Sequence, residues 1–365
     1  MRIVLLSHFA NYWTAPYATH LASAGHDVLA VGFDDGTIPG IRTATIGRQP
    51  WERHKYGYVT RALAFGRLAR DFRADVVVAT YVVSNGLTAA LGWRGPLVVS
   101  AHGYDLLVAA SYHGPVGWMR RRLAAAVCRR AAVLHVVSDE MAAEARRLGV
   151  ATDRIAVIPV GIDPSRFAPG LPEPRALPRI VCTRRHERVY DNETIIDAFA
   201  RLRAKGVPFE ATLVGAGPLT RDYAARIDRH RLDDIVTLAP AVTTDAMPSL
   251  LHDADIYVSA SLVDGTSSAL LEAMAVGLLP VVTDIPANAA WIDEGRNGLR
   301  FPAGGVDELA DALERACLDS ELRARARAVN RAVVLARADR RTCLERLEAA
   351  VRRAPALHRG SQQPP

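Results

Sequence analysis

The sequence predicts an α/β protein made of two doubly wound, parallel-sheet domains. Short apolar, β-branched runs alternate with amphipathic helical stretches, a pattern typical of sheets that carry helices on both faces. A proline-rich segment interrupts this alternation once, near the middle of the chain. A length of 365 residues exceeds one ordinary α/β core and suits two.

The first expected domain spans residues 1–165. Its strands are short and rich in Val, Ile and Leu, as buried parallel strands are. We expect these strands at 2–7, 28–33, 76–80, 97–100, 133–137 and 155–160. The intervening helices are expected at 17–24, 58–72, 118–130 and 139–148.

Prolines at 164, 169, 172, 174 and 178 end the first domain. Proline at this density continues neither a helix nor a central strand, so residues 166–178 are expected to form a linker. The second domain is expected over 179–335, followed by a C-terminal helix over 336–353 and a disordered tail over 354–365. Its strands are expected at 179–183, 210–214, 235–238, 255–260 and 280–283, with helices at 193–205, 219–230, 247–252 and 267–276.

The composition allows an anionic partner without choosing one. The net charge is +6, and Lys55 and Lys205 are the only lysines among the basic residues. Arginine suits phosphate recognition, but the positive balance fits a nucleotide-sugar, a polyphosphate lipid or a membrane surface equally. We expect no nucleic-acid partner.

Targeting and metal signals are weak. The four cysteines form no CxxC pair and do not cluster with histidine, which argues against zinc sites and a disulfide scaffold. The apolar N-terminal run is too short for a secretory signal, and polar residues interrupt the uncharged run from Val76 to Trp93. We therefore expect a cytoplasmic protein without a metal.

The strongest candidate site lies between Ser259 and Asp284. Gly265 lets backbone approach a ligand, and the helix that follows can present free N–H groups to an anion at the carboxyl end of a parallel strand. Three potential capping residues stand there: Thr266, Ser267 and Ser268. With a diphosphate on the helix end, Asp264 and Glu272 could accept hydrogen bonds from sugar hydroxyls. An ordinary capped helix with two solvated acids fits the same spacing.

This segment resembles the signature of glycosyltransferase family 4, retaining enzymes with the GT-B fold. The family motif is a Glu, seven residues, a second Glu, Ala-Met-Ala and Gly, with Pro-Val-Val after it. Glu272 matches the second Glu, and Asp264 replaces the first with a side chain one methylene shorter. Further resemblance runs through 157–167, 213–218, 254–259 and 297–299. It implies two Rossmann-like domains that face each other across a cleft, and a C-terminal helix over 336–353 that packs back on the N-terminal domain.

The resemblance also implies roles in binding the donor. The first acid would contact the transferred sugar, the second would bind the nucleotide ribose, and the Gly265–Ser268 backbone would meet the sugar and the diphosphate. Gly215 matches a glycine in the family's strand-to-helix turn. Arg184 matches the family's diphosphate-binding Arg, but Tyr190 stands where the family has a second cation, and Tyr supplies no charge. A solvated surface Arg184 is the alternative.

The first domain offers candidate residues for the sugar and the acceptor. His102 belongs to a His-Gly-x-Asp pattern with Asp105, where the family's His faces the donor sugar. A neutral His could bond a sugar hydroxyl or stabilise the transition state, although a histidine at a strand end can also be structural. His8 and Asn11 lie in a loop that replaces the family's Gly-Gly loop and suits a sugar-like acceptor.

The resemblance implies transfer of a hexose-type sugar from a UDP- or GDP-sugar to a hydroxyl acceptor. The acceptor would be a glycan, a lipid-linked glycan or a small molecule, with no cofactor beyond the nucleotide-sugar. The basic helix near Arg120 suggests peripheral contact with the inner membrane face, although a solvated helix face fits as well.

Three other functions make different demands on the sequence or on turnover. A dehydrogenase needs a Gly-x-Gly-x-x-Gly after a first strand, and neither domain has one; Thr220 occupies the third glycine position after Gly215 and Gly217. A sugar-nucleotide epimerase would turn over the donor without an acceptor. A non-catalytic sugar-nucleotide-binding partner subunit would bind the donor without transfer.

Overall fold

The chain divides into two compact units, which are described separately. The computed structural model describes residues 1–365 except 48–56, 104–105, 108–113, 171–175 and 361–365. Unit 1 comprises Met1–Pro159 and Thr342–Pro365, and unit 2 comprises Val160–Arg341. The first boundary therefore falls six residues before the expected one at 165.

Unit 1 is built on a parallel sheet of seven strands in the order β3-β2-β1-β4-β5-β6-β7. The strands are β1 (Arg2–Leu6), β2 (Asp27–Gly32), β3 (Arg42–Thr45), β4 (Val76–Thr80), β5 (Leu97–Ala101), β6 (Val133–Val136) and β7 (Ile155–Val157). The connections contain α1 (Thr14–Ser23), α2 (Gly57–Thr60), α3 (Ala62–Asp71), the π-helical turn η1 (Tyr81–Gly86), α4 (Leu87–Gly92), α6 (Gly114–Arg130), α7 (Asp139–Arg147) and η2 (Thr152–Arg154).

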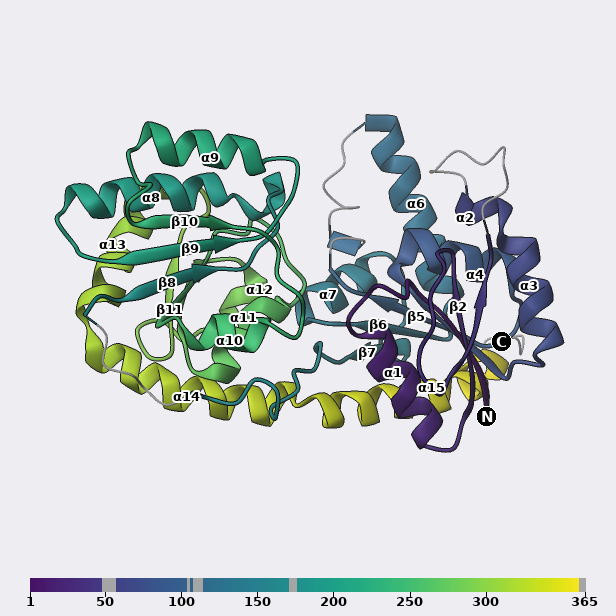
Figure 1. The fold of residues 1–365 in the computed structure, drawn as a ribbon. Coiled ribbons are helices and arrows are strands. Elements are labelled where there is room, and N and C mark those ends of the chain that lie inside the picture. Colours follow the sequence, from purple (N-terminus) through teal and green to yellow (C-terminus); the bar gives the residue numbers. More distant parts are fainter. Residues whose placement is uncertain (48–56, 104–105, 108–113, 171–175, 361–365) are drawn as a thin grey trace. The chain divides into compact units, whose positions relative to one another are not determined.

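One face of this sheet is covered by α1 and the end of the chain (Figure 1). Alternate strand residues such as Ile3 and Leu5 point to this face and pack against α1 and α15 (Arg340–Gly360). Leu347 and Val351 are part of the same core. Residues 342–360 thus belong to unit 1 although they follow unit 2 in sequence.

Unit 2 has a parallel sheet of six strands in the order β10-β9-β8-β11-β12-β13. The strands are β8 (Arg179–Cys182), β9 (Glu210–Val214), β10 (Val236–Ala239), β11 (Ile256–Ser259), β12 (Leu279–Thr283) and β13 (Leu299–Phe301). The helices are η3 (Arg188–Tyr190), α8 (Asn192–Ala204), α9 (Thr220–Arg229), α10 (Met247–His252), α11 (Ser268–Val276), α12 (Pro286–Ala289), α13 (Val306–Leu318) and α14 (Ser320–Ala338).

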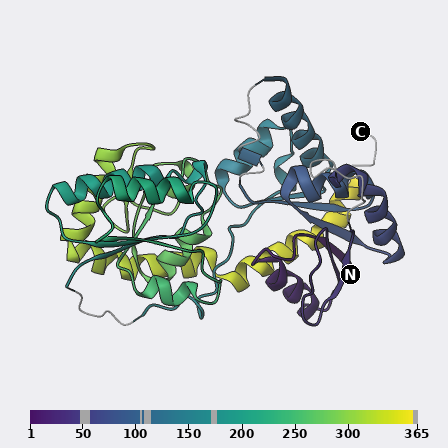
Figure 2. The ribbon, with the colours of Figure 1, turned by 45° about the horizontal axis from the view of Figure 1, so that its top comes forward.

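Two helical layers enclose the sheet of unit 2. Ile180 and Cys182 pack with α8, α9 and α13, whereas Val181, between them in the strand, packs with α10, α11 and α14. This alternation is the period of two that a strand imposes on its side chains. Figures 1 and 2 show the two helical layers on either side of the strands.

Several expectations need correction. Residues 354–360 are helical rather than disordered, because Ala354 is fully buried in the core of unit 1. Phe167 lies in the expected linker, yet it is buried in the core of unit 2, and Arg331 Nη1 donates to its carbonyl oxygen at 2.6 Å. The sequence also failed to predict β3 (Arg42–Thr45), whose short polar sequence lies at the edge of the sheet.

Candidate active site

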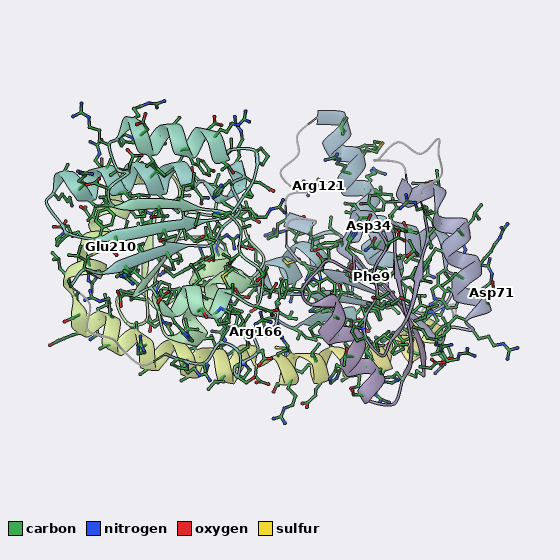
Figure 3. The ribbon with its side chains drawn as sticks, viewed as in Figure 1. Phe9, Asp34, Asp71, Arg121, Arg166 and Glu210 are labelled. Carbon is green, nitrogen blue, oxygen red and sulfur yellow. The ribbon has the colours of Figure 1, made fainter. Side chains whose placement is uncertain are left out.

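Each unit contains one cluster of side chains that includes predicted site residues. We call Arg184, Tyr190, Asp264, Ser267 and Glu272 the charged cluster, and all of them belong to unit 2. We call Trp13, Tyr81, Ser100, His102 and His135 the aromatic cluster, and all of them belong to unit 1. Figure 3 shows the side chains of both units.

Strand order brings the charged cluster together. Arg184 follows β8, and Asp264 follows β11, which is the neighbour of β8 in the sheet. The connection from β8 leads to β9 on one side, while β11 lies on the other, so the two carboxyl ends meet where the strand order reverses. Ligands of open α/β sheets bind at such points.

Arg184 is held by two polar partners. Its Nη2 donates to Asp264 Oδ2 at 2.6 Å, and its Nη1 donates to Ser267 Oγ at 2.7 Å. Only 8% of Arg184 is exposed, so it is not the solvated surface arginine that the sequence left open. Burial alone would lower the pKa of Arg184, but Asp264, together with Tyr257, Tyr190 and Cys182, outweighs burial and raises that pKa. The guanidinium therefore keeps its charge.

Tyr190 supports the same guanidinium. The Cζ atom of Arg184 lies 4.2 Å from the centroid of the Tyr190 ring. This distance is typical of a cation–π contact, which fixes a cation without neutralising it. Tyr190 thus contacts the arginine through its ring face, and the only charged group of the pair is Arg184.

The segment from Gly265 to Ser268 prepares the start of α11. Gly265 N donates to Asp264 Oδ1 at 2.9 Å, which anchors the carboxylate from its other oxygen. Ser267 is the N-cap, and its hydroxyl accepts from Leu270 N at 3.2 Å. The helix begins at Ser268, one residue later than expected. Ser267 Oγ therefore contacts both Arg184 and the helix N-terminus.

Glu272 lies in the second turn of α11 and is half-buried. Burial raises the pKa of its carboxyl to about 7, although the arginines Arg340, Arg166 and Arg184 oppose the rise. Within the part of the chain that the structure describes, no hydrogen bond or ion pair to Glu272 is found. Its carboxyl group is therefore able to take up a hydrogen bond from a ligand.

Gly215 lets the turn after β9 approach the segment that carries Arg184. A Cβ atom at Gly215 would lie 2.7 Å from the carbonyl oxygen of Arg184 and 3.0 Å from His186 Nε2. A side chain at this position would push the backbone of Arg184 away. Gly215 therefore acts on the charged cluster through packing.

The aromatic cluster lies at the carboxyl ends of β1, β4 and β5. Trp13 stacks on the ring of His102, with centroids 4.4 Å apart and planes inclined by 21°. The Tyr81 ring is 5.4 Å from His102, and Tyr81 itself has a φ of 63°, in the left-handed region that a bulky residue rarely adopts. Burial and nearby His135 lower the pKa of His102 to about 3, so its ring is neutral at physiological pH.

Two polar residues of the aromatic cluster were not predicted. Ser100 Oγ lies 3.0 Å from His102 Nε2 and 2.6 Å from His135 Nδ1. His135 Nε2 lies 2.8 Å from the carbonyl oxygen of Ile158. Both residues are polar side chains inside otherwise apolar strands, and this signal could have identified them from the sequence.

The remaining predicted acceptor residues are placed less tightly. His8 Nδ1 lies 3.5 Å from Oδ2 of Asp34, a residue labelled in Figure 3. The centroids of the His8 and Tyr81 rings are 6.1 Å apart. The Asn11 side chain amide nitrogen is buried and finds no hydrogen-bond partner among the described residues. Asp105 lies outside the described residues.

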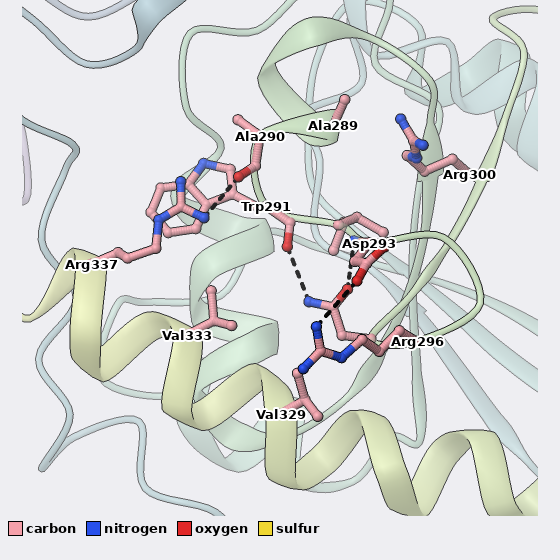
Figure 4. A pocket seen from close by; sticks show the side chains of 11 residues that line it. Ala289, Ala290, Trp291, Asp293, Arg296, Arg300, Val329, Val333 and Arg337 are labelled. Atoms are coloured by element: carbon pink, nitrogen blue, oxygen red, sulfur yellow. Dashed lines mark hydrogen bonds and ion pairs between the residues drawn. The ribbon is translucent and has the colours of Figure 1, made fainter.

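A surface pocket of unit 2 is lined by none of the residues of the charged cluster. It has a volume of about 390 Å³ and lies between α14 and the segment after α12 (Figure 4). Arg337 covers the Trp291 ring at 4.1 Å there, and Arg296 pairs with Asp293 at 3.3 Å. These side chains hold one another, and the pocket contains no predicted site residue.

The described residues contain neither a metal-binding group nor a membrane-spanning helix. Among the residues that the structure describes, no group of three or more His, Cys, Asp or Glu side chains is arranged to hold a metal ion. Over the same residues, no helix combines the length and the apolar character needed to span a bilayer.

Both halves of the chain resemble known glycosyltransferases. Residues 14–166 match the family model described as Glycosyltransferase Family 4, and residues 177–319 match the model described as Glycosyl transferases group 1. The "Putative colanic acid biosynthesis glycosyltransferase WcaL" of Escherichia coli (strain K12) is 28% identical over 276 residues, which cover 71% of this chain and 66% of that protein.

Solved structures extend the likeness over nearly the whole chain. Sucrose-phosphate synthase from Thermosynechococcus elongatus superposes with a TM-score of 0.83 at 19% identity, covering 98% of this chain and 99% of that one. Anabaena HepE in complex with UDP-glucose gives a TM-score of 0.79 at 18% identity, covering 96% and 99%. The two family matches identify the chain as a glycosyltransferase family 4-like protein, and the solved structures show that its fold is GT-B.

Proposed function

We propose that the protein is a retaining glycosyltransferase. It moves a hexose-type sugar from a nucleotide-diphosphate sugar to a hydroxyl acceptor in polysaccharide, glycolipid or other glycan biosynthesis. The observation that carries the proposal is the buried Arg184 guanidinium beside Asp264 and the N-terminus of α11. A fixed cation beside a helix N-terminus at this edge of a parallel sheet suits a diphosphate.

Donor binding in this proposal exchanges the partners of Arg184. Asp264 now occupies one side of the guanidinium, so an incoming diphosphate competes with that carboxylate. Once displaced, Asp264 is available to accept a hydrogen bond from a hydroxyl of the transferred sugar. Glu272, which lacks a partner among the described residues, accepts hydrogen bonds from the ribose.

The chemistry asked of this chain is positioning and electrostatic stabilisation. The bond from the anomeric carbon to the diphosphate breaks, the acceptor oxygen bonds to the same face of that carbon, and the departing phosphate takes up the acceptor proton. Arg184 and the Gly265–Ser268 backbone stabilise the charge on the leaving diphosphate. His102, neutral at physiological pH, acts as a hydrogen-bonding group in the aromatic cluster.

A UDP-sugar is the first donor to test, because the structurally similar HepE binds UDP-glucose; GDP-mannose is the second. The first acceptor to test is a polysaccharide intermediate, because the similar protein WcaL is named for colanic acid biosynthesis.

We also propose that the outer face of α6 contacts an anionic membrane, since Trp118 and Met119 are exposed beside Arg121 and Arg122. Figure 3 labels Arg121 on this helix.

The first experiment is a thermal-shift screen of UDP, UDP-glucose and GDP-mannose, followed by product assays with and without acceptor. Saturable donor binding with acceptor-dependent transfer and a retained anomeric configuration supports the proposal. Conversion of the donor to an epimer without acceptor would identify an epimerase. Binding without turnover would identify a partner subunit, an outcome that the Tyr190 substitution makes worth testing.

Asp264→Asn is the sharpest single variant. It keeps the shape of the side chain and removes the anion that competes for Arg184. We expect UDP affinity to stay equal or to rise, while kcat falls about 100-fold because a transition-state contact is lost. A large loss of UDP affinity with unchanged kcat would contradict the exchange of partners.

A further inference from the structure

The hydrogen-bond chain behind His102 has only one consistent arrangement of protons. It runs from the carbonyl oxygen of Ile158 to His135 Nε2 at 2.8 Å, from His135 Nδ1 to Ser100 Oγ at 2.6 Å, and from Ser100 Oγ to His102 Nε2 at 3.0 Å. All of its members belong to unit 1.

The carbonyl at one end sets the direction. A carbonyl oxygen only accepts, so His135 Nε2 carries a hydrogen and donates it to Ile158. In the neutral ring, Nδ1 then holds a lone pair and accepts from the Ser100 hydroxyl. That hydroxyl has a single hydrogen, so its oxygen can only accept from His102, and His102 Nε2 must carry a hydrogen.

This order of donors requires His135 to be neutral. A doubly protonated His135 would donate to Ser100 and reverse the chain. Burial lowers the pKa of His135 to about 4, although its hydrogen bond to Ile158 acts in the opposite direction. The ring is therefore neutral at physiological pH, and the order of donors is fixed.

We infer that Ser100 and His135 are positioning residues that hold His102 as the neutral Nε2–H tautomer, with its lone pair on Nδ1. Trp13 stacks on the ring and fixes its plane. His102 therefore meets any partner at Nδ1 as an acceptor, which selects hydroxyl or N–H groups and rejects phosphate and carbonyl oxygens. The link to sugar transfer rests on the proposed function, but the tautomer does not.

The tautomer can be measured without any activity. The full chain is labelled with ¹⁵N-histidine, and two-bond correlations in the ring identify each tautomer; the signals are assigned with His102→Gln and His135→Gln. We expect both rings to be neutral Nε2–H tautomers at pH 7. A Nδ1–H tautomer or a protonated ring at either position would overturn the inference.

Variants then test the positioning role. Ser100→Ala removes the hydroxyl that links the two rings, so we expect the His102 signals to change and kcat to fall about tenfold with little change in the KM of the donor. Ser100→Thr keeps the hydroxyl and should restore both. Ser7→Ala is the matched control, because Ser7 is also a buried strand-end serine but bonds Thr14 instead.

The outcomes separate the two proposals. Expected tautomers without sugar transfer from any donor would contradict the proposed function and leave the hydrogen-bond chain intact. Transfer with a different tautomer, or a Ser100→Ala enzyme with unchanged kcat, would contradict the positioning role and leave the proposed function intact.

Discussion

The two units share a strand order but differ in the chemistry at the carboxyl ends of their strands. In both, the first strand of the unit lies between the second strand and the fourth, so the same topology creates the same edge. Unit 2 places a buried arginine, two carboxylates and a helix N-terminus there, whereas unit 1 places a tryptophan and two neutral histidines. Topology decides where a ligand can bind, and the side chains decide which one.

This contrast suggests a division of labour. The charged cluster of unit 2 should control binding of the diphosphate, and the neutral aromatic cluster of unit 1 should control contacts with sugar or acceptor hydroxyls. Five predictions test this division and the membrane contact proposed for α6, from the largest expected effect to the smallest.

Arg184→Ala should lower donor affinity by at least about 100-fold, because a buried charge-assisted contact with the diphosphate is lost. It should also destabilise unit 2 by about 3–5 kcal/mol, since Asp264 is left as an unpaired carboxylate with only 16% of its side chain exposed. Calorimetric titration with UDP-glucose and thermal unfolding measure the two effects.

The control is Arg185→Ala, at the next position, where 72% of the side chain is exposed. It should change neither affinity nor stability appreciably. If the Arg184→Ala protein bound UDP-glucose like the wild type, the diphosphate would not bind at the charged cluster.

Donor affinity should depend on pH through Glu272. The ionised carboxylate is the better hydrogen-bond acceptor, and its pKa is raised to about 7. UDP-glucose should therefore bind about tenfold more tightly at pH 8 than at pH 6, in proportion to the ionised fraction. Glu272→Gln should flatten this dependence in a titration series; an equally steep curve in the variant would assign the effect to another group.

The same pKa has a consequence for stability. The folded state keeps the Glu272 proton up to about pH 7, whereas the unfolded state loses it near the usual value of 4.5. Its contribution to stability is thus largest below the unfolded pKa and falls as pH rises through the folded one. The free energy of unfolding of the wild type should decline relative to Glu272→Gln from pH 5 to pH 8 in denaturant titrations.

Trp13→Ala should act on unit 1 alone. The stack on His102 is lost, which is worth about 0.5–1.5 kcal/mol, so the KM of the acceptor should rise by up to about tenfold while the Kd of UDP-glucose stays constant. Trp13→Phe keeps a stacking ring and should be milder. A change in donor affinity larger than the change in acceptor KM would break the proposed division of labour.

The smallest effect is expected on α6. Arg121→Gln should weaken binding to vesicles that contain anionic lipid by about fivefold, corresponding to about 1 kcal/mol for one basic residue. Co-sedimentation with neutral and anionic vesicles measures it. Arg67→Gln on α3 is the matched exposed control, and equal losses in the two variants would exclude a specific membrane face on α6.

Local patterns predicted most of this architecture. The central strands are apolar enough to be identified from composition alone; β4 (Val76–Thr80) and β9 (Glu210–Val214) have the expected bounds. The edge strand β3 lacked that signal, because an edge strand need not be apolar on both faces. The helical residues 354–360 were not predicted, because packing on unit 1 extends the expected C-terminal helix through contacts that the local sequence does not reveal.

The sequence by itself determined the two-domain α/β class, the helix that carries Glu272, and the residue types capable of binding a diphosphate. The tertiary structure decided which of them meet. Arg184 and Asp264 are 80 positions apart and pair because β8 and β11 are neighbours, and Ser100 faces His135 because β5 and β6 align in that register. Strand pairing joins distant segments through backbone hydrogen bonds, which every residue can form, so local sequence does not specify these partners.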